Sequence, residues 1–229
     1  MQKIVILTGA GISAESGLGT FRDEGGLWSQ HRIEDVATPE GFARDPALVQ
    51  GFYNARRAQA VDARPNPAHE ALARLQRDWP GEVVIVTQNV DDLHEKGGAR
   101  DVLHMHGTLA GALCGACGHR WSAPAEMAVG ETCPECNAPR ARPDVVWFGE
   151  MPYHMDEIFA HLQEATLFAA IGTSGQVYPA AAFVEEAVGA HRVELNLEPS
   201  AAVSRFDETR FGPASRTVPD WVEEVLARG

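Results

Sequence analysis

The chain has 229 residues, 45% of them hydrophobic, which is enough for one well-buried α/β domain carrying a small insertion. Its 32 acidic residues outnumber its 19 basic residues and give a net charge of −13, which disfavours nucleic acid as the main partner. No apolar run is long enough for a membrane helix, and the first residues lack the pattern of a signal peptide, so we expect a cytoplasmic protein with no membrane partner.

Short apolar runs along the chain are predicted strands. They are rich in Val and Ile and are continuous rather than alternating, which is typical of a parallel sheet covered on both faces. The predicted strands are residues 4–7, 83–87, 102–105, 145–147, 167–171 and 193–197.

Helical segments separate most of these strands. Asp45 and Pro46 predict the start of a helix that runs to about residue 61, because an acidic N-cap and a proline in the first turn favour helix initiation. Further helices are predicted at residues 67–77, 155–164, 179–189 and 220–228. The alternation indicates an α/β fold with a doubly wound, Rossmann-like parallel sheet.

Two segments interrupt the alternation and are predicted to form a smaller domain. Residues 31–66 have a helical pattern without a strand, and residues 111–143 hold all four cysteines. The larger, dinucleotide-binding domain would then comprise residues 1–30, 67–110 and 144–229.

A glycine-rich turn follows the first predicted strand and is expected to open a helix. Gly9 and Gly11 would let the backbone approach a phosphate, with free N–H groups at the helix start facing its charge. The next glycine is Gly17, so the usual dinucleotide spacing is broken. A dehydrogenase is disfavoured, because the acidic residue it needs at the end of a second strand would fall within the helical segment 31–66.

Polar residues follow two further predicted strands. Asn89 and Asp91 come after residues 83–87, at the carboxyl end where open parallel sheets bind ligands. A helix cap or Asx turn explains such a pair equally well. His106 follows residues 102–105 and can act as a general base near neutral pH, but His104 lies two residues earlier, and the residues alone do not distinguish the two. Either histidine can also be purely structural.

The four cysteines form two Cys-x-x-Cys pairs, which indicate a tetrahedral zinc site. The pairs are Cys114 with Cys117 and Cys133 with Cys136. Four thiolates leave no open position for water, so the zinc would be structural. The cytoplasm disfavours disulfides, and a redox dithiol would need only one pair. His119 is near enough to substitute but is not needed.

The motifs, taken together and in order, resemble the sirtuins, protein deacylases that consume NAD. The matching blocks continue the glycine-rich turn through Thr20-Phe21-Arg22-Asp23 and recur to near the end of the chain, at residues 87–94, 104–109, 146–150, 172–174 and 196–198. The resemblance implies a sirtuin fold whose small domain holds a four-cysteine zinc ribbon. It covers almost the whole chain, although Gly19 stands where the family often has Pro or Arg.

The resemblance also implies the roles of individual residues. His106, the histidine before a glycine, would be the catalytic base, with Asn89 and Asp91 beside it; Phe21 would shield the reacting ribose and Arg22 would order the surrounding loop. NAD would be bound by Gly9, Ala10, Gly11, Ser13, Glu15, Phe21, Arg22, Trp28, Gln88, Asn89, Val90, Asp91, Gly172, Thr173, Ser174, Asn196, Leu197, Glu198 and Ala214.

The resemblance extends to the substrate. The segment of Val146, Phe148, Gly149 and Glu150 would pair as a strand with the backbone of an acylated peptide. Tyr53 and Arg56 lie three apart on a predicted helix and therefore share a face. In the similar class of sirtuins such a pair binds the carboxylate of malonyl- or succinyl-lysine. Outside the family, the same pair would be an ordinary salt-bridging arginine and a half-buried tyrosine.

The resemblance therefore implies an NAD-dependent deacylase with acylated-lysine proteins as partners. It would remove acetyl and succinyl or malonyl groups and release nicotinamide and O-acyl-ADP-ribose, with NAD consumed and one zinc per chain. An ADP-ribosyltransferase and a non-enzymatic NAD or peptide sensor remain as alternatives. An activity that survives replacement of His106 would exclude its role as base.

Overall fold

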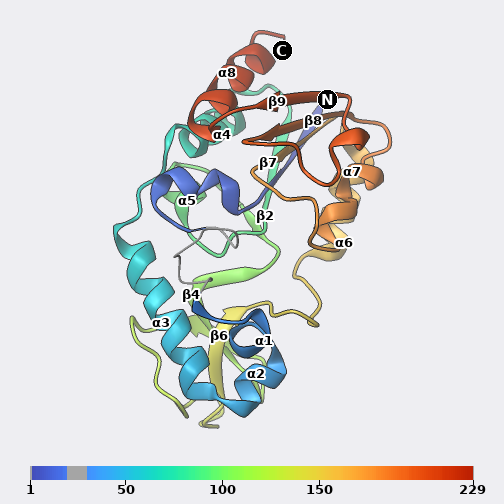
Figure 1. The fold of residues 1–229 in the computed structure, drawn as a ribbon. Helices are drawn as coiled ribbons and strands as arrows, with labels where there is room; N and C mark the ends of the chain where they lie inside the picture. The colour runs from blue at the N-terminus through green and yellow to red at the C-terminus, as the bar shows by residue number, and fades with distance from the viewer. Residues whose placement is uncertain (1, 20–29, 229) are drawn as a thin grey trace.

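The computed structural model describes residues 2–19 and 30–228, and its largest element is a parallel sheet (Figure 1). The order of the strands is β3-β2-β1-β7-β8-β9. Their bounds are β1 (Lys3–Thr8), β2 (Glu82–Thr87), β3 (Leu103–His104), β7 (Leu167–Ile171), β8 (His191–Asn196) and β9 (Glu208–Phe211).

The order of the strands reverses between β1 and β7. From β1 the chain proceeds outward through β2 to β3, and from β7 it proceeds in the other direction through β8 to β9. Thr8 pairs with Thr87 on one side and with Ile171 on the other, so the carboxyl ends of the central strands lie level. Ligands of open α/β sheets bind at such a reversal, outside the carboxyl ends of the strands.

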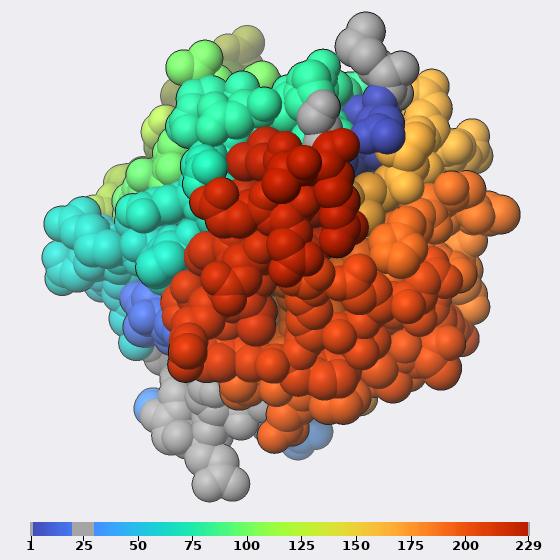
Figure 2. All heavy atoms as spheres, turned by 90° about the horizontal axis from the view of Figure 1, so that it is seen from above, coloured from blue at the N-terminus to red at the C-terminus, as the bar shows by residue number. Residues whose placement is uncertain are grey.

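Helices cover both faces of the parallel sheet. One face is covered by α4 (Pro67–Asp78) and α8 (Ala214–Leu226), which also pack on each other (Figure 2), and the other face by α6 (Met155–Glu164) and α7 (Phe183–Glu186). Side chains alternate between these layers, since Ile4 and Ile6 contact the first and Val5 and Leu7 the second. The predicted doubly wound fold is confirmed.

The remaining elements gather below the parallel sheet in Figure 1. They are α1 (Ile33–Val36), α2 (Pro39–Arg44), α3 (Pro46–Asp62) and an antiparallel sheet in the order β5-β4-β6, formed by β4 (Gly107–Cys114), β5 (Arg120–Ser122) and β6 (Ala141–Val145). The start of α3 is as predicted, because the Asp45 carboxylate accepts a hydrogen bond from Leu48 N at 2.9 Å and Pro46 follows it. The exact domain boundaries stay a prediction.

The glycine-rich turn does not open an α-helix, so that prediction is wrong. It forms two short 3₁₀ turns, Ala10–Ile12 and Ala14–Ser16, and the second ends at Gly17 with a φ of +83°. A residue in this left-handed conformation stops the helical hydrogen-bond pattern, and glycine adopts it without strain. One further short helix, α5 (Leu93–Lys96), follows β2.

Several predicted boundaries are also wrong. Of the strand expected at residues 145–147, only Val145 lies in a strand, as the last residue of β6 in the antiparallel sheet, and residues 146 and 147 lie outside any strand. Residues 179–189 form a 3₁₀ turn, Ala180–Ala182, followed by the short α7. Helix α8 begins six residues before the predicted start, at Ala214, with Pro219 inside its early turns. Strand β9, at the edge of the sheet, was not predicted, because its sequence Glu-Thr-Arg-Phe has one apolar residue and so lacks the apolar run of a buried strand. Among the described residues no helix is long and apolar enough to span a bilayer.

Candidate active site

The predicted site residues follow successive strands and meet at one edge of the parallel sheet. Gly9 follows β1, Gln88 follows β2, Gly172 follows β7 and Asn196 ends β8. This edge contains the reversal of strand order between β1 and β7. Predicted residues Phe21, Arg22 and Trp28 lie outside the described residues.

Close backbone packing explains the glycines at the centre of this edge. The amide N–H groups of Gly9 and Gly11 donate to the carbonyls of Ile171 and Gly172 at 3.0 and 2.8 Å. A Cβ atom on Gly11 would lie 2.8 Å from the Gly172 Cα, and one on Gly172 would lie 2.4 Å from Ile12 N. Contrary to expectation, these two N–H groups are thus used inside the protein. A side chain at either position would collide with backbone atoms, so this close packing of the turn on the end of β7 requires glycine.

Asn89, Ser13 and Asp91 form a hydrogen-bonded group beside the glycines. The Asn89 Nδ2 donates to the Gly9 carbonyl at 3.2 Å and to Ser13 Oγ at 3.1 Å, and Ser13 Oγ donates to Asp91 Oδ2 at 3.1 Å. The other Asp91 oxygen accepts from Leu93 N at 3.1 Å, so the Asx turn is present as well as the cluster. Burial raises the pKa of Asp91, although these hydrogen bonds oppose the shift.

Two buried histidines lie behind this group, and sequence reasoning did not single them out. His69 Nδ1 accepts from Asn66 N at 3.3 Å, so its proton is on Nε2, which lies 3.5 Å from Ser13 Oγ. His94 Nε2 lies 2.9 Å from Thr8 Oγ1. Burial lowers the pKa of His69 to about 4 and that of His94 to about 3, so both are neutral at pH 7. A signal for His69 was present, since it stands three residues after the N-cap Asn66 and completes a capping box.

The structure distinguishes His106 from His104. His106 Nδ1 lies 3.0 Å from the Gln88 carbonyl, which can only accept, so the proton is on Nδ1 and the Nε2 lone pair is left for a substrate. Burial lowers the pKa of His106 and outweighs the opposing effect of this bond. In His104 both ring nitrogens are bonded, at 3.1 Å to the Asn89 carbonyl and at 2.8 Å to Glu95 Oε1. Burial lowers the pKa of His104, but the bond to Glu95 and that carboxylate's charge outweigh it and raise the pKa overall.

The predicted adenosine side joins the ends of β7 and β8. Gln88 Nε2 donates to Thr173 Oγ1 at 3.1 Å, and Asn196 Nδ2 donates to the Thr173 carbonyl at 2.7 Å. Leu197 and Glu198 are exposed beyond them, and the Ser174 carbonyl accepts from Ala201 N at 3.0 Å. The glycine-lined edge and these hydroxyl and amide groups fit the phosphates and riboses of a dinucleotide.

Glu15, predicted to bind NAD, has a structural contact. Its carboxylate accepts hydrogen bonds from the backbone N–H and the hydroxyl of Ser215, in the first turn of α8, and the backbone bond is 3.0 Å long. The positive end of the α8 helix dipole also stabilises the negative charge of this carboxylate. Glu15 therefore fastens the glycine-rich turn to α8, beside Ala214.

Tyr53 and Arg56 lie together on α3, as their spacing predicted. The guanidinium carbon of Arg56 is 5.9 Å from the centre of the Tyr53 ring and 5.8 Å from that of Phe52. Tyr53 is 1% exposed, and its hydroxyl accepts a hydrogen bond from Trp147 Nε1 at 2.9 Å. Burial lowers the pKa of Arg56, and the electrostatic effects of Tyr53 and of Asp91 oppose this shift.

The segment from Val146 to Glu150 has no strand partner within the described part of the chain, and its pairing with a substrate peptide stays a prediction. The amides of Val146 and Phe148 donate to the carbonyls of His106 and Ala37, each at 2.9 Å. A turn follows, in which Glu150 N donates to the Trp147 carbonyl at 3.0 Å. Phe148 remains 45% exposed, and Gly149 has a φ of +91°.

The four cysteines come together in the geometry of a zinc site. Their sulfur atoms all lie within 4.8 Å of one another; Cys114 and Cys136 are 3.7 Å apart, and Cys117 and Cys133 are 3.8 Å apart. Zinc–sulfur bonds of about 2.3 Å in a tetrahedron require sulfur atoms roughly 3.8 Å apart, so the four residues fit this ion. A disulfide bond would need two sulfur atoms about 2 Å apart, so these cysteines are not disulfide-bonded. His119 stacks on Trp121, with ring centres 5.8 Å apart.

Three comparisons with known proteins, of family, sequence and structure, all find similarity to Sir2 proteins or NAD-dependent protein deacylases. Residues 9–179 match the model of the Sir2 family. The chain is 56% identical over 231 residues to an NAD-dependent protein deacylase of Vibrio parahaemolyticus, covering 99% of this chain and 96% of the relative. Among solved structures it is similar to a Sir2 homolog–NAD complex, with a TM-score of 0.91 and 36% identity over 99% of this chain and 90% of the other. The structure of Sir2Af2 bound to a myristoylated histone peptide has a TM-score of 0.75 and 32% identity, with coverages of 99% and 91%.

Proposed function

Because this chain belongs to the Sir2 family, we propose that it is an NAD-dependent protein deacylase that removes acetyl, succinyl and malonyl groups from lysine side chains. The 56% identical relative is an NAD-dependent protein deacylase, and a similar solved structure holds a myristoylated histone peptide; both support the deacylase activity. The placement of Tyr53 beside Arg56 on α3 is the observation that supports the acidic acyl groups.

In this proposal NAD lies along the edge of the parallel sheet, over Gly9, Gly11 and Gly172. When bound, NAD would supply the ribose carbon that bonds the acyl oxygen as its bond to nicotinamide breaks; with one water consumed and the bond between acyl carbon and lysine nitrogen broken, the products would be nicotinamide, free lysine and O-acyl-ADP-ribose. Thr173, Ser174 and Asn196 would hold the adenosine half, and Asn89 and Asp91 would hold the nicotinamide ribose. Phe21, Arg22 and Trp28 remain proposed contacts.

His106 is the proposed general base. Its Nδ1 proton is held by the Gln88 carbonyl, so Nε2 is the atom that can take a proton from a ribose hydroxyl. The lowered pKa keeps the ring neutral at pH 7, which is the form that a base requires. The bond to Gln88 also fixes the orientation of the ring.

Arg56 and Tyr53 are proposed to bind the carboxylate at the end of a succinyl or malonyl group. A guanidinium offers paired donors that match the two oxygens of a carboxylate, and a phenol can add a third. Burial lowers the pKa of Arg56, and an anionic acyl end beside the guanidinium would favour its charged form. An acetyl group would fit the same space without these contacts.

The proposal can be tested with acetyl-lysine and succinyl-lysine peptides in the presence of NAD, with products identified by mass. O-acyl-ADP-ribose is the expected product from both peptides. ADP-ribose attached to a protein side chain would indicate a transferase instead. Arg56→Met is expected to lower kcat/KM on the succinyl peptide by about tenfold or more relative to the acetyl peptide, because a charge-assisted hydrogen bond is lost.

Arg44→Met is the matched control, since Arg44 is an exposed arginine of α2 that pairs with Asp35 at 2.6 Å. It should leave the ratio of the two activities unchanged. Equal losses on both peptides in Arg56→Met would contradict the carboxylate contact but would not contradict the proposed deacylase function.

The proposed enzyme acts on protein partners and carries a structural metal. The partners are proteins carrying acylated lysines, and the net charge of −13 would steer basic segments of such proteins toward the enzyme. Zinc would be structural, because four cysteines complete its coordination. A cytoplasmic location stays a prediction.

A further inference from the structure

Trp147 is absent from the predicted site residues, yet it contacts the proposed acyl-binding tyrosine directly. Its side chain is buried at 2% exposure, and its Nε1–H donates to the Tyr53 hydroxyl oxygen at 2.9 Å. The two residues are 94 positions apart and come from α3 and from the segment after β6. Neither the proposed base His106 nor the proposed NAD contacts use this buried contact.

The contact with Trp147 determines whether the Tyr53 hydroxyl donates or accepts a hydrogen bond. An indole nitrogen can only donate, so the Tyr53 oxygen must accept and its own proton cannot point at Trp147. In the part of the chain that the structure describes, no acceptor takes that proton. Because a buried hydroxyl proton without a partner is unfavourable, Tyr53 favours a ligand that offers an acceptor.

Two charged residues hold Trp147 in this position. The guanidinium carbon of Arg142 lies 3.5 Å from the centre of the Trp147 ring. Arg142 is itself held by both Glu150 oxygens, at 2.6 and 2.8 Å, and by the Val145 carbonyl at 2.8 Å. Glu150 Oε2 also accepts from the backbone N–H of Trp147 at 2.8 Å. Arg142, Trp147 and Glu150 thus form a closed assembly that restricts the indole ring.

We propose that Trp147 determines acyl specificity by holding the Tyr53 hydroxyl as a hydrogen-bond donor, which selects acyl groups ending in a carboxylate. Arg142 and Glu150 are positioning residues that act through Trp147. Glu150, which was expected to pair with the substrate peptide, therefore serves the acyl-binding side of the site. This inference rests on the proposed contact of Tyr53 with acidic acyl groups.

The test uses Trp147→Phe, which keeps an aromatic ring for Arg142 but removes the N–H. We expect the ratio of kcat/KM for succinyl-lysine over acetyl-lysine peptide to fall about threefold to tenfold, through a higher KM for the succinyl peptide rather than a lower kcat. In a Tyr53→Phe background the same substitution should have no further effect on the ratio, because the hydroxyl that it orients is gone.

Trp79→Phe is the matched control. Trp79 is buried and its Nε1–H donates to the Gln2 carbonyl at 3.3 Å, beside the end of α4, so the variant also loses an indole hydrogen bond but should not change the ratio. If Trp147→Phe does not fold, Arg142→Lys provides a second test, since it keeps the charge beside Glu150 but loses the planar face over the indole, and it should lower the ratio.

The outcomes separate this inference from the proposed function. A lowered ratio in Tyr53→Phe with an unchanged ratio in folded Trp147→Phe would overturn the role of Trp147 alone. An unchanged ratio in both Tyr53→Phe and Arg56→Met would overturn the proposed acyl contact itself. Equal losses on both peptides in Trp147→Phe would show a merely structural role.

Discussion

Two histidines near the site, His104 and His106, differ in protonation because only His104 has a carboxylate on its second ring nitrogen. His104 and His106 lie two positions apart, and each donates a hydrogen bond from Nδ1 to a backbone carbonyl. The second nitrogen of His104 meets Glu95, which favours the protonated ring, whereas burial favours the neutral ring in His106. The carboxylate therefore makes one histidine structural and leaves the other available as a base.

The pH dependence of the reaction should show which histidine acts. A base must be neutral, so the rate should fall as pH drops through the pKa of His106, which burial lowers from the ordinary 6.5. We expect the acid limb of kcat/KM for the acetyl peptide to have its midpoint below pH 6.5. A midpoint above pH 6.5 would contradict this assignment and would match His104, whose pKa is raised.

At the scale of elements, α3 connects the proposed acyl site with residues 111–143, the segment that holds the four cysteines and is called the cysteine module below. Tyr53 and Arg56 serve the site, while Asn54 exchanges hydrogen bonds with the backbone N–H and carbonyl of Met127 at 3.0 and 3.1 Å, and Gln50 donates to the Ala141 carbonyl at 3.2 Å. The core of the module contains few buried residues, Ala112, Met127 and Ala141. So small a core needs a metal for its stability.

Removal of zinc should therefore loosen both the module and α3. We expect about one zinc per chain, and chelation should lower the unfolding temperature and expose residues 111–143 and α3 to hydrogen exchange before the parallel sheet. His119→Gln is the control and should keep the metal, because His119 stacks on Trp121 and is not needed as a ligand. An unchanged exchange pattern after complete removal of the metal would contradict the role of zinc in holding α3.

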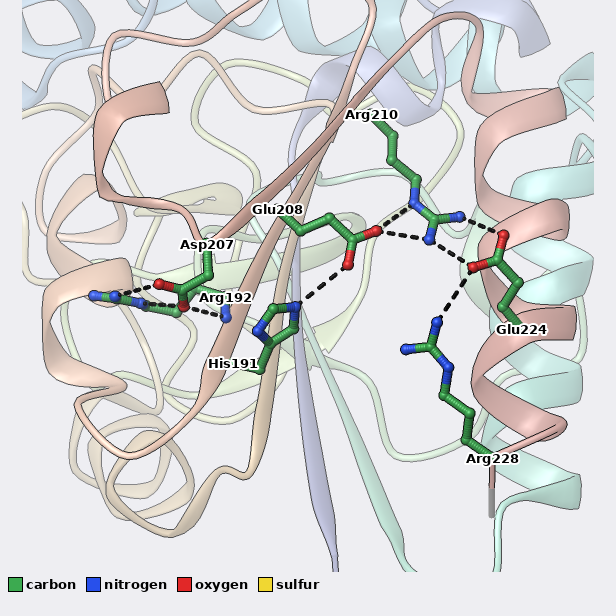
Figure 3. A network of polar contacts seen from close by, with 7 residues as sticks. All are labelled: His191, Arg192, Asp207, Glu208, Arg210, Glu224 and Arg228. Carbon is green, nitrogen blue, oxygen red and sulfur yellow. Dashed lines mark hydrogen bonds and ion pairs between the residues drawn. The ribbon is translucent and has the colours of Figure 1, made fainter.

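At the scale of the whole molecule, ion pairs fasten the C-terminal helix to the outer strands of the sheet (Figure 3). Arg210 on β9 contacts Glu208 at 2.6 Å and Glu224 of α8 at 2.7 Å, and Arg228 approaches Glu224 at 3.5 Å. On β8, Arg192 pairs with Asp207 at 2.8 Å, and its hydrogen bonds lower the pKa of Asp207 to about 2. The network matters because α8 covers one face of the sheet and also carries the contact with Glu15.

Arg210→Gln should lower the unfolding temperature at low salt by more than the exposed control Arg77→Gln, which loses only the pair with the adjacent Asp78. The difference should shrink at high salt, because screening weakens exposed charges. The measurement is thermal unfolding at two salt concentrations. A deficit that is the same at both would show that Arg210 acts through packing rather than charge.

Local patterns in the sequence were sufficient to predict the four-cysteine site, the residues of the central strands and the start of α3. Two Cys-x-x-Cys pairs predict their own geometry because each pair forms a short turn, and continuous Val and Ile runs predict buried strands because each face must be covered. Residues after those strands could be placed at one edge, since parallel strands all end there. The family resemblance supplied the roles of the candidate residues, and these stay proposals.

Only the tertiary structure decided which distant groups meet. Gly11 packs on Gly172, and Trp147 bonds Tyr53 across 94 positions; neither contact has a local signature. Residues 145–147 were wrongly placed in the parallel sheet because a short apolar run does not reveal which sheet it joins. The physical reason is that local sequence determines backbone preference and apolar faces, whereas the partner of each hydrogen-bonding group depends on how those faces pack.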